Sequence, residues 1–201
     1  MGLYERYLAA RIGRHECDGP DHVALVITER DLLEQGAYET LSAFVEWALR
    51  PAERATIYVS VLDEEAIPTL RRELAALEVP VDLAVRGPDD RQPADAPVQI
   101  GIGLGGKHEF TNAVTTLATA VDAGELAADE IEDRHVESHL VFPSEPDLVI
   151  KTGAERLSDF MIWQSVYSEL YFTDVNWRDF RKRDFLRAVL EYCNRSRRYG
   201  R

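Results

Sequence analysis

The chain has 201 residues, of which 45% are hydrophobic, and its formal net charge of −13 comes from 36 acidic against 23 basic residues. That length supports one buried core, and the acidic balance excludes nucleic acid as a generic partner because phosphates repel such a surface. No apolar run reaches the roughly 20 residues that cross a bilayer, and the first residues lack a secretion-signal pattern, so we expect one cytoplasmic domain over residues 1–201.

Apolar runs bounded by turn residues predict five strands, and the segments around them have helical periodicity. The strands are expected at about His22–Thr28, Ala55–Leu62, Val79–Val85, Val98–Gly103 and Asp147–Lys151. Helices are expected near residues 3–12, 41–49, 70–77, 109–123, 156–169 and 179–197, and a surface loop over 86–97. Strands that alternate with helices predict an α/β fold: a single domain with a parallel-rich central sheet and helices on both faces.

The charge is unevenly distributed along the chain. Residues 178–201 carry nine basic and three acidic side chains, which makes this tail +6 and the rest of the chain −19. A solvated helix with cations near its C-terminal dipole accounts for part of the cluster, and the remainder favours an anionic ligand. The acidic surplus elsewhere is typical of a halophilic surface.

The cysteine and histidine spacings indicate little redox or metal chemistry. Cys17 and Cys193 are far apart and form no Cys-x-x-Cys motif, so we expect two packed or idle thiols and no disulfide. His135 and His139 have the spacing of two metal ligands on one helix face, but no third ligand lies nearby in sequence. A solvated helix face is the favoured interpretation.

A glycine-rich segment, Gly101–Gly106, formally contains the Gly-x-Gly-x-x-Gly pattern of dinucleotide sites. Such a site needs an acidic residue about 20 positions later, at the end of a strand. Asp122 falls at the end of a predicted helix instead. We therefore favour a tight turn between a strand and a helix.

The most informative region runs from Pro146 to Phe180. It reads Asp-Leu-Val-Ile-Lys-Thr-Gly-Ala-Glu-Arg-Leu-Ser from Asp147 and Tyr-Ser-Glu-Leu-Tyr-Phe from Tyr167. A strand end followed by a turn and a helix start would gather Lys151, Arg156 and Ser158 around one concavity with backbone donors. That is the chemistry of a diphosphate pocket. The alternative is a plain surface ion pair between Glu155 and Arg156.

This region resembles the diphosphate-binding signature of the cis-prenyltransferases, the undecaprenyl diphosphate synthase family, and the first helix is similar to that of archaeal members. The resemblance implies an undecaprenyl diphosphate synthase-like fold, synthesis of polyprenyl diphosphates from isopentenyl diphosphate and an allylic diphosphate, and Mg²⁺ as cofactor. It assigns isopentenyl diphosphate to Lys151, Arg156, Ser158, Arg198 and Gly200, and magnesium to Glu169. The last two substrate-binding positions belong to a terminal Arg-x-Gly motif that reaches across the interface of family dimers.

The other half of the family's active site departs from the pattern. Thr28 aligns with the metal-binding aspartate after the first strand, and Glu29 aligns with a glycine that lets backbone approach phosphate. Lys151 is a point charge where the family has a planar arginine. Losing one preorganised group costs about 10²–10³ in rate, so we expect no catalytic residue in this chain. Glu29 or Asp31 in a rearranged loop is the alternative metal ligand.

The chain thus resembles the family in its diphosphate-binding signature but departs from it after the first strand. Three hypotheses follow from this difference. In the first, the chain is a non-catalytic subunit, similar to the Nogo-B receptor, that forms a heterodimer with an intact paralogue, or a homodimer. In the second, it is a self-sufficient, divergent polyprenyl diphosphate synthase. In the third, it is a module that binds isoprenoid diphosphates without reaction. Because the family's products are lipids, the resemblance also implies at most peripheral contact with a membrane surface.

Overall fold

The computed structural model describes residues 2–15, 17–91, 95–153 and 159–195. Six strands form one sheet in the order β3-β4-β2-β1-β5-β6, and all five neighbouring pairs are parallel. The strands are β1 His22–Thr28, β2 Arg54–Ser60, β3 Leu83–Arg86, β4 Val98–Ile102, β5 Leu148–Thr152 and β6 Glu169–Thr173. The predicted parallel α/β sheet is therefore confirmed, and β1 has the predicted bounds.

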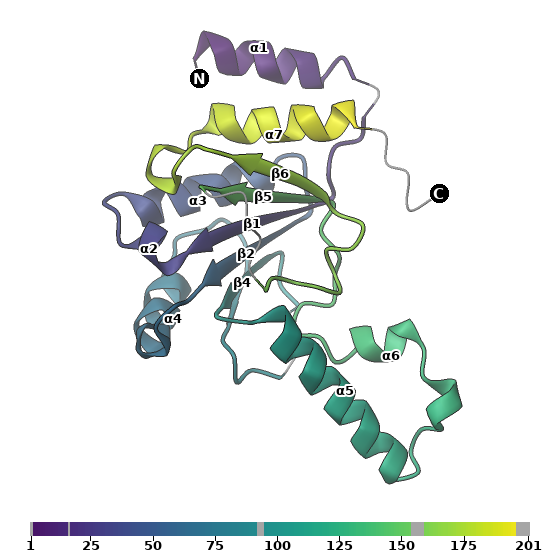
Figure 1. Cartoon of the computed structure of the whole chain (residues 1–201). Coiled ribbons are helices and arrows are strands. Elements are labelled where there is room, and N and C mark those ends of the chain that lie inside the picture. The colour runs from purple at the N-terminus through teal and green to yellow at the C-terminus, as the bar shows by residue number, and fades with distance from the viewer. Residues whose placement is uncertain (1, 16, 92–94, 154–158, 196–201) are drawn as a thin grey trace.

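Helices surround the sheet, and those packed directly on it lie on one face (Figure 1). The α-helices are α1 Leu3–Ile12, α2 Glu29–Leu32, α3 Ala37–Ala48, α4 Ile67–Ala75, α5 Gly106–Asp122, α6 Asp133–Glu137 and α7 Lys182–Asn194. Short 3-10 helices are η1 Glu64–Ala66, η2 Ala128–Glu130 and η3 Trp177–Asp179. Helix α5 extends away from the sheet together with α6, and α1 lies outside α7 as an outermost layer (Figure 1).

The main core lies between one sheet face and helices α3, α4 and α7. Alternate strand residues such as Leu25, Ile57 and Ile150 are fully buried there against Phe44 and Trp177. The Trp177 indole donates its N–H to the Ala37 carbonyl at 3.2 Å, so the largest buried ring has a polar partner. This layer positions the strands so that their carboxyl ends meet at one edge.

The opposite face is covered by a smaller cluster. Ala24, Val26 and Val149 pack there against Phe142 and Phe160, which come from irregular segments rather than from a helix. The side chains of Thr28 and Lys151 follow the same alternation, so they belong to this second face at its carboxyl edge.

The predicted helix at 156–169 is wrong over its described part. Residues 159–168 form bends and turns, and residues from Glu169 onward form β6, which sequence analysis missed. Met161 has φ of 34°, which an α-helix does not accommodate, and the Ser168 hydroxyl donates to the Pro146 carbonyl at 2.6 Å. Tertiary contacts therefore override the helical period of this segment.

The expectation of two idle thiols is also wrong. Cys17 and Cys193 form a disulfide, with Cα atoms 5.6 Å apart, although 176 positions separate them in sequence. The bond becomes possible because α1 lies against α7, which brings the segment after α1 to the last turn of α7. It ties the outermost helix to the body of the protein.

Candidate functional site

The candidate site lies at the carboxyl ends of β1 and β5, where ligands bind in open parallel sheets. Lys151 is only 7% exposed, and its ammonium donates to the Thr152 carbonyl at 2.8 Å. Burial lowers the pKa of Lys151, and the nearby Asp31 carboxylate raises it in part. A buried cation at a strand end is costly without an anionic partner, so the position favours a negatively charged ligand.

A second polar group at this edge has an unused hydrogen-bonding capacity. Thr152 is 2% exposed, and its hydroxyl has no hydrogen-bond partner among the described residues. By the alternation of β5, the Thr152 side chain belongs to the sheet face of Ile150, opposite to that of Lys151, so its hydroxyl does not line the same site.

In the segment after β1, side chains of the segment itself occupy its backbone hydrogen-bond donors. Helix α2 begins at Glu29, and Thr28 is its N-cap. One oxygen of the Asp31 carboxylate accepts from the Thr28 amide at 2.7 Å and from the Thr28 hydroxyl at 2.8 Å. Thr28 returns the contact by accepting from the Asp31 amide at 3.4 Å. This capping box uses the backbone donors that a phosphate would need.

The Glu29 carboxylate also makes a hydrogen bond within the chain. Its carboxylate accepts from the Asp63 amide at 3.4 Å, which connects α2 to the segment after β2. The alternative that Glu29 or Asp31 ligates a metal therefore competes with hydrogen bonds that both carboxylates already make. The Thr-Glu-Arg-Asp spacing at Thr28 is a capping-box signal that sequence analysis did not use.

The glycine turn after β4 forms the third side of the site. Gly103 has φ of 63°, which favours glycine, and α5 begins at Gly106. The Asp159 carbonyl accepts from the Gly106 amide at 2.9 Å, and the Asp159 carboxylate accepts from the Lys107 amide at 2.8 Å. The N-terminus of α5 is therefore capped by a carboxylate, which disfavours a dinucleotide phosphate there.

Tyr58 connects this turn to the sheet. Its hydroxyl donates to the Asp159 carbonyl at 3.3 Å, and burial, together with the negative charges of Asp159 and Glu109, raises its pKa to about 12. The phenol is therefore a neutral hydrogen-bond donor at physiological pH. It holds the segment after the diphosphate signature against β2.

Four of the predicted substrate-binding residues, Arg156, Ser158, Arg198 and Gly200, lie outside the described residues. Lys151 is described and lies at the carboxyl edge of the sheet. Glu169 lies at the opposite edge, because it pairs in register with Leu148 at the start of β5. Its carboxylate contacts the Arg195 guanidinium at 3.2 Å. One chain therefore does not bring Glu169 and Lys151 together.

Comparison with known proteins decides the family. A family model described as "Putative undecaprenyl diphosphate synthase" matches residues 75–200, more than half of the chain. The chain belongs to the undecaprenyl diphosphate synthase family. This confirms the family predicted from the signature. Residues 1–74, which include β1 and α2, lie outside the match.

Relatives and solved structures extend this finding. A tritrans,polycis-undecaprenyl-diphosphate synthase (geranylgeranyl-diphosphate specific) of Methanocaldococcus jannaschii is 48% identical over 109 residues, which cover 51% of this chain and 39% of the relative. An isoprenyl transferase of Listeria monocytogenes is 42% identical over 106 residues, which cover 51% of this chain and 42% of the relative. The matched region thus spans about two-fifths of each curated relative.

The solved structures support the fold across nearly the whole chain. Lavandulyl diphosphate synthase from Lavandula x intermedia, in complex with dimethylallyl diphosphate, superimposes with a TM-score of 0.76 at 24% identity and covers 92% of this chain and 99% of that one. A probable undecaprenyl diphosphate synthase from Campylobacter jejuni gives 0.67 at 22% identity, covering 90% and 99%. Similarity in shape therefore includes most of residues 1–74, which the family model does not match.

The family's magnesium does not fit the described residues. Thr28 offers no carboxylate, Asp31 holds the α2 cap, and Glu169 pairs with Arg195 at the other edge of the sheet. Over the described ranges, no group of three or more His, Cys, Asp or Glu side chains could hold a metal ion. His135, one of the two spaced histidines, instead accepts from the Glu132 amide at 2.9 Å and caps α6.

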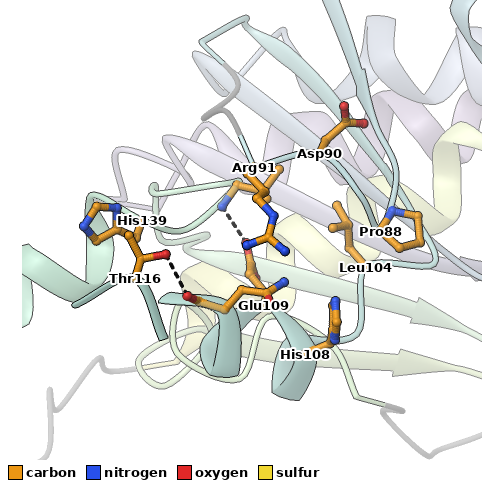
Figure 2. Close-up of a pocket in the computed structure, with 10 residues that line it drawn as sticks. Pro88, Asp90, Arg91, Leu104, His108, Glu109, Thr116 and His139 are labelled. Carbon is orange, nitrogen blue, oxygen red and sulfur yellow. Dashed lines mark hydrogen bonds between the residues drawn. The ribbon is translucent and has the colours of Figure 1, made fainter. Parts of the chain in front are cut away.

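A separate pocket of about 200 Å³ lies beside α5, and Figure 2 shows its lining. His108, Glu109 and His139 contribute to it, together with Pro88 and Leu104. Burial raises the pKa of Glu109, whose carboxylate accepts from the Val141 amide at 2.7 Å and from the Gln164 amide group at 3.2 Å. This carboxylate therefore links α5 to two irregular segments through hydrogen bonds within the protein.

Proposed function

We propose that this chain is a non-catalytic member of the undecaprenyl diphosphate synthase family. In this proposal it binds isoprenoid diphosphates and supports polyprenyl diphosphate synthesis by a paralogous subunit. The observation that carries the proposal is the capping box after β1, in which Asp31 occupies the Thr28 amide and hydroxyl. A carboxylate in this place repels phosphate and removes the donors that would stabilise a departing diphosphate.

A residue at the carboxyl end of β5 supports the proposed binding of isoprenoid diphosphates. Lys151 is a buried cation. The Lys151 ammonium, on the second face of the sheet, suits an oxygen of isopentenyl diphosphate. Because Asp31 partly offsets the charge of Lys151, we expect weaker affinity than an arginine fork would provide.

The position of Glu169 supports a two-chain arrangement. A magnesium site that used Glu169 together with the Lys151 edge would require a second chain, because the two residues lie at opposite ends of neighbouring strands. We propose an intact paralogue as that second chain. It would supply the metal-binding aspartate that is replaced here by Thr28.

A turnover assay tests the proposal directly. The purified chain is mixed with labelled isopentenyl diphosphate, an allylic diphosphate and magnesium, with and without an intact paralogue. We expect no product from the chain alone and faster product formation by the paralogue when the chain is added. Product from the chain alone would contradict the proposal and favour a self-sufficient enzyme. Diphosphate binding without any effect on the paralogue would favour a binding module.

A pair of lysine variants tests the pocket itself. Lys151→Gln keeps the length of the side chain and removes its charge, so binding of isopentenyl diphosphate should weaken about tenfold or more, as expected for a charge-assisted contact. Lys182→Gln removes the same charge in the first turn of α7, a helix that packs on the other face of the sheet, and is the matched control. Calorimetric titration gives both affinities. Equal affinities for the two variants would place the diphosphate elsewhere.

A further inference from the structure

A hollow of about 480 Å³ lies between α1, α7 and β6, on the outer side of the molecule (Figure 1). Its volume is within the range of sites that hold small molecules. Tyr171 of β6 lines it and pairs in register with Ile150, so its side chain lies on the face of the main core. The Lys151 side chain lies on the other face. This α1–α7 hollow is therefore separate from the candidate diphosphate site.

Contacts between the two helices hold the walls of the α1–α7 hollow together. The Arg187 guanidinium of α7 donates to the Tyr4 hydroxyl of α1 at 3.2 Å and lies 5.2 Å from the Tyr4 ring. The Cys17–Cys193 disulfide fastens the segment after α1 to the last turn of α7. Neither wall is a membrane helix, since over the described residues no helix is long and apolar enough to span a bilayer. A ligand would meet a cavity that is formed in advance, which lowers the cost of binding.

Aromatic and apolar side chains form much of the lining. Tyr4 and Tyr7 lie about one turn apart on α1, with ring centroids separated by 6.2 Å and ring planes inclined by 21°. Leu8 of α1 and Leu190 of α7 add apolar surface. Because tyrosine rings offer faces and edges on which another ring can pack, the lining favours a ligand that carries an aromatic ring.

One guanidinium in this lining lacks a counter-charge. Over the described ranges, Arg11 of α1 forms no ion pair with a carboxylate. The other charges of the lining are compensated, because Arg187 contacts the Asp184 carboxylate at 3.2 Å and Glu191 contacts the Arg195 guanidinium at 3.3 Å. A single uncompensated cation suits a monoanion rather than a diphosphate. The planar guanidinium of Arg11 matches the two oxygens of a carboxylate.

Two phenol groups of the lining are available as hydrogen-bond donors. Among the residues that the structure describes, the Tyr7 and Tyr171 hydroxyls make no hydrogen bond. Burial raises the pKa of Tyr171, and the charge of Arg187 lowers it in part, so this phenol is neutral and can donate. Asn194, at the end of α7, adds a side-chain amide. These groups suit the oxygens of a carboxylate.

We propose that the α1–α7 hollow binds a small aromatic monocarboxylate. The ring would pack among the tyrosine side chains, and the carboxylate would accept from the Arg11 guanidinium and from tyrosine hydroxyls. The two arginines of the lining disfavour a cation, and an aliphatic acid would leave the aromatic rings unused. The site goes beyond the proposed function, because it requires neither Lys151 nor a second chain.

Amide chemical-shift titration of the intact, disulfide-bonded chain with benzoate tests the proposal. We expect saturable shifts at residues of α1 and α7. Benzamide keeps the ring and removes the charge, whereas acetate keeps the charge and removes the ring. Each should therefore bind about tenfold more weakly than benzoate, or worse.

Variants of two lining residues locate the ligand. Arg11→Gln should weaken benzoate binding about tenfold or more, as expected for loss of a charge-assisted contact. Tyr171→Phe removes only a hydroxyl and should weaken binding about fivefold. Arg72→Gln removes the same charge as Arg11→Gln from an exposed position on α4 and should leave the affinity unchanged. Thermal unfolding of each variant verifies that it is folded.

Three results would overturn the proposal: no saturable shift, equal affinities for benzoate and benzamide, or equal affinities of the Arg11→Gln and Arg72→Gln variants. Shifts confined to the carboxyl edge of the sheet would also overturn it, because they would place benzoate at the diphosphate site. Isopentenyl diphosphate affinity should be the same in the Arg11→Gln variant as in the unchanged protein. Failure of this proposal and failure of the proposed function are therefore distinguishable.

Discussion

At the scale of single residues, His22 shows how burial sets a pH dependence. It is 5% exposed, with one ring nitrogen 3.0 Å from the Glu145 carbonyl and the other 2.8 Å from the Thr56 hydroxyl. Burial lowers the pKa of the imidazole to about 4 from 6.5, although the bond to Glu145 acts in the opposite direction. The ring therefore has a structural role at the start of β1.

The shifted pKa of His22 predicts a loss of stability in acid. Between pH 6.5 and about 4 the unfolded chain takes up a proton at this residue and the folded chain does not. The free energy of unfolding should therefore fall as pH falls through this window, by up to about 3 kcal/mol from His22. Urea unfolding across the window, compared with His22→Gln, isolates this contribution. Identical pH dependence in both proteins would contradict it.

At the scale of elements, the turn before α5 depends on a close approach of two backbones. A Cβ atom on Gly106 would lie 2.9 Å from the Ile162 amide nitrogen, closer than real Cβ contacts. The same turn receives the Asp159 carbonyl and carboxylate. Helix α5 and the segment after the diphosphate signature are thus joined at a point where only glycine fits.

Gly106→Ala should therefore destabilise the protein by about 1–3 kcal/mol, because rigid backbone must move. Gly13→Ala is the control, since its Cβ would meet the Ala9 and Ala10 carbonyl oxygens at ordinary contact distances of 3.5 and 4.0 Å, and its φ of −66° suits alanine. That variant should be neutral or slightly stabilising. Thermal unfolding compares the two. A Gly106→Ala protein as stable as the control would rule out close packing at this turn.

At the scale of the whole molecule, the Cys17–Cys193 disulfide joins the segments near the two ends of the chain. Closing so long a loop restricts the unfolded chain, and a native disulfide typically contributes about 2–4 kcal/mol. Adding a thiol reductant should therefore lower the melting temperature. A variant with Cys17→Ser and Cys193→Ser should start lower and show no response. An equal response of both proteins would assign the effect of the reductant to something else.

Sequence patterns predicted much of the fold from local information. Buried strands such as β1 are continuous apolar runs bounded by turn residues, and the parallel order follows from their alternation with helices. β6 was missed because an edge strand is half-exposed and its residues alternate weakly. Its pairing with β5 decides its structure, and that pairing has no local signal.

The sequence by itself determined the family and the α/β sheet, because both are written in neighbouring residues. Only the tertiary structure decided what distant residues do together. Asp159 caps a helix that starts 53 positions earlier, at Gly106, and two cysteines 176 positions apart form a bond. Helix α1, near one end of the chain, packs against α7, near the other. Such contacts depend on how the sheet brings chain segments together, which no local pattern encodes.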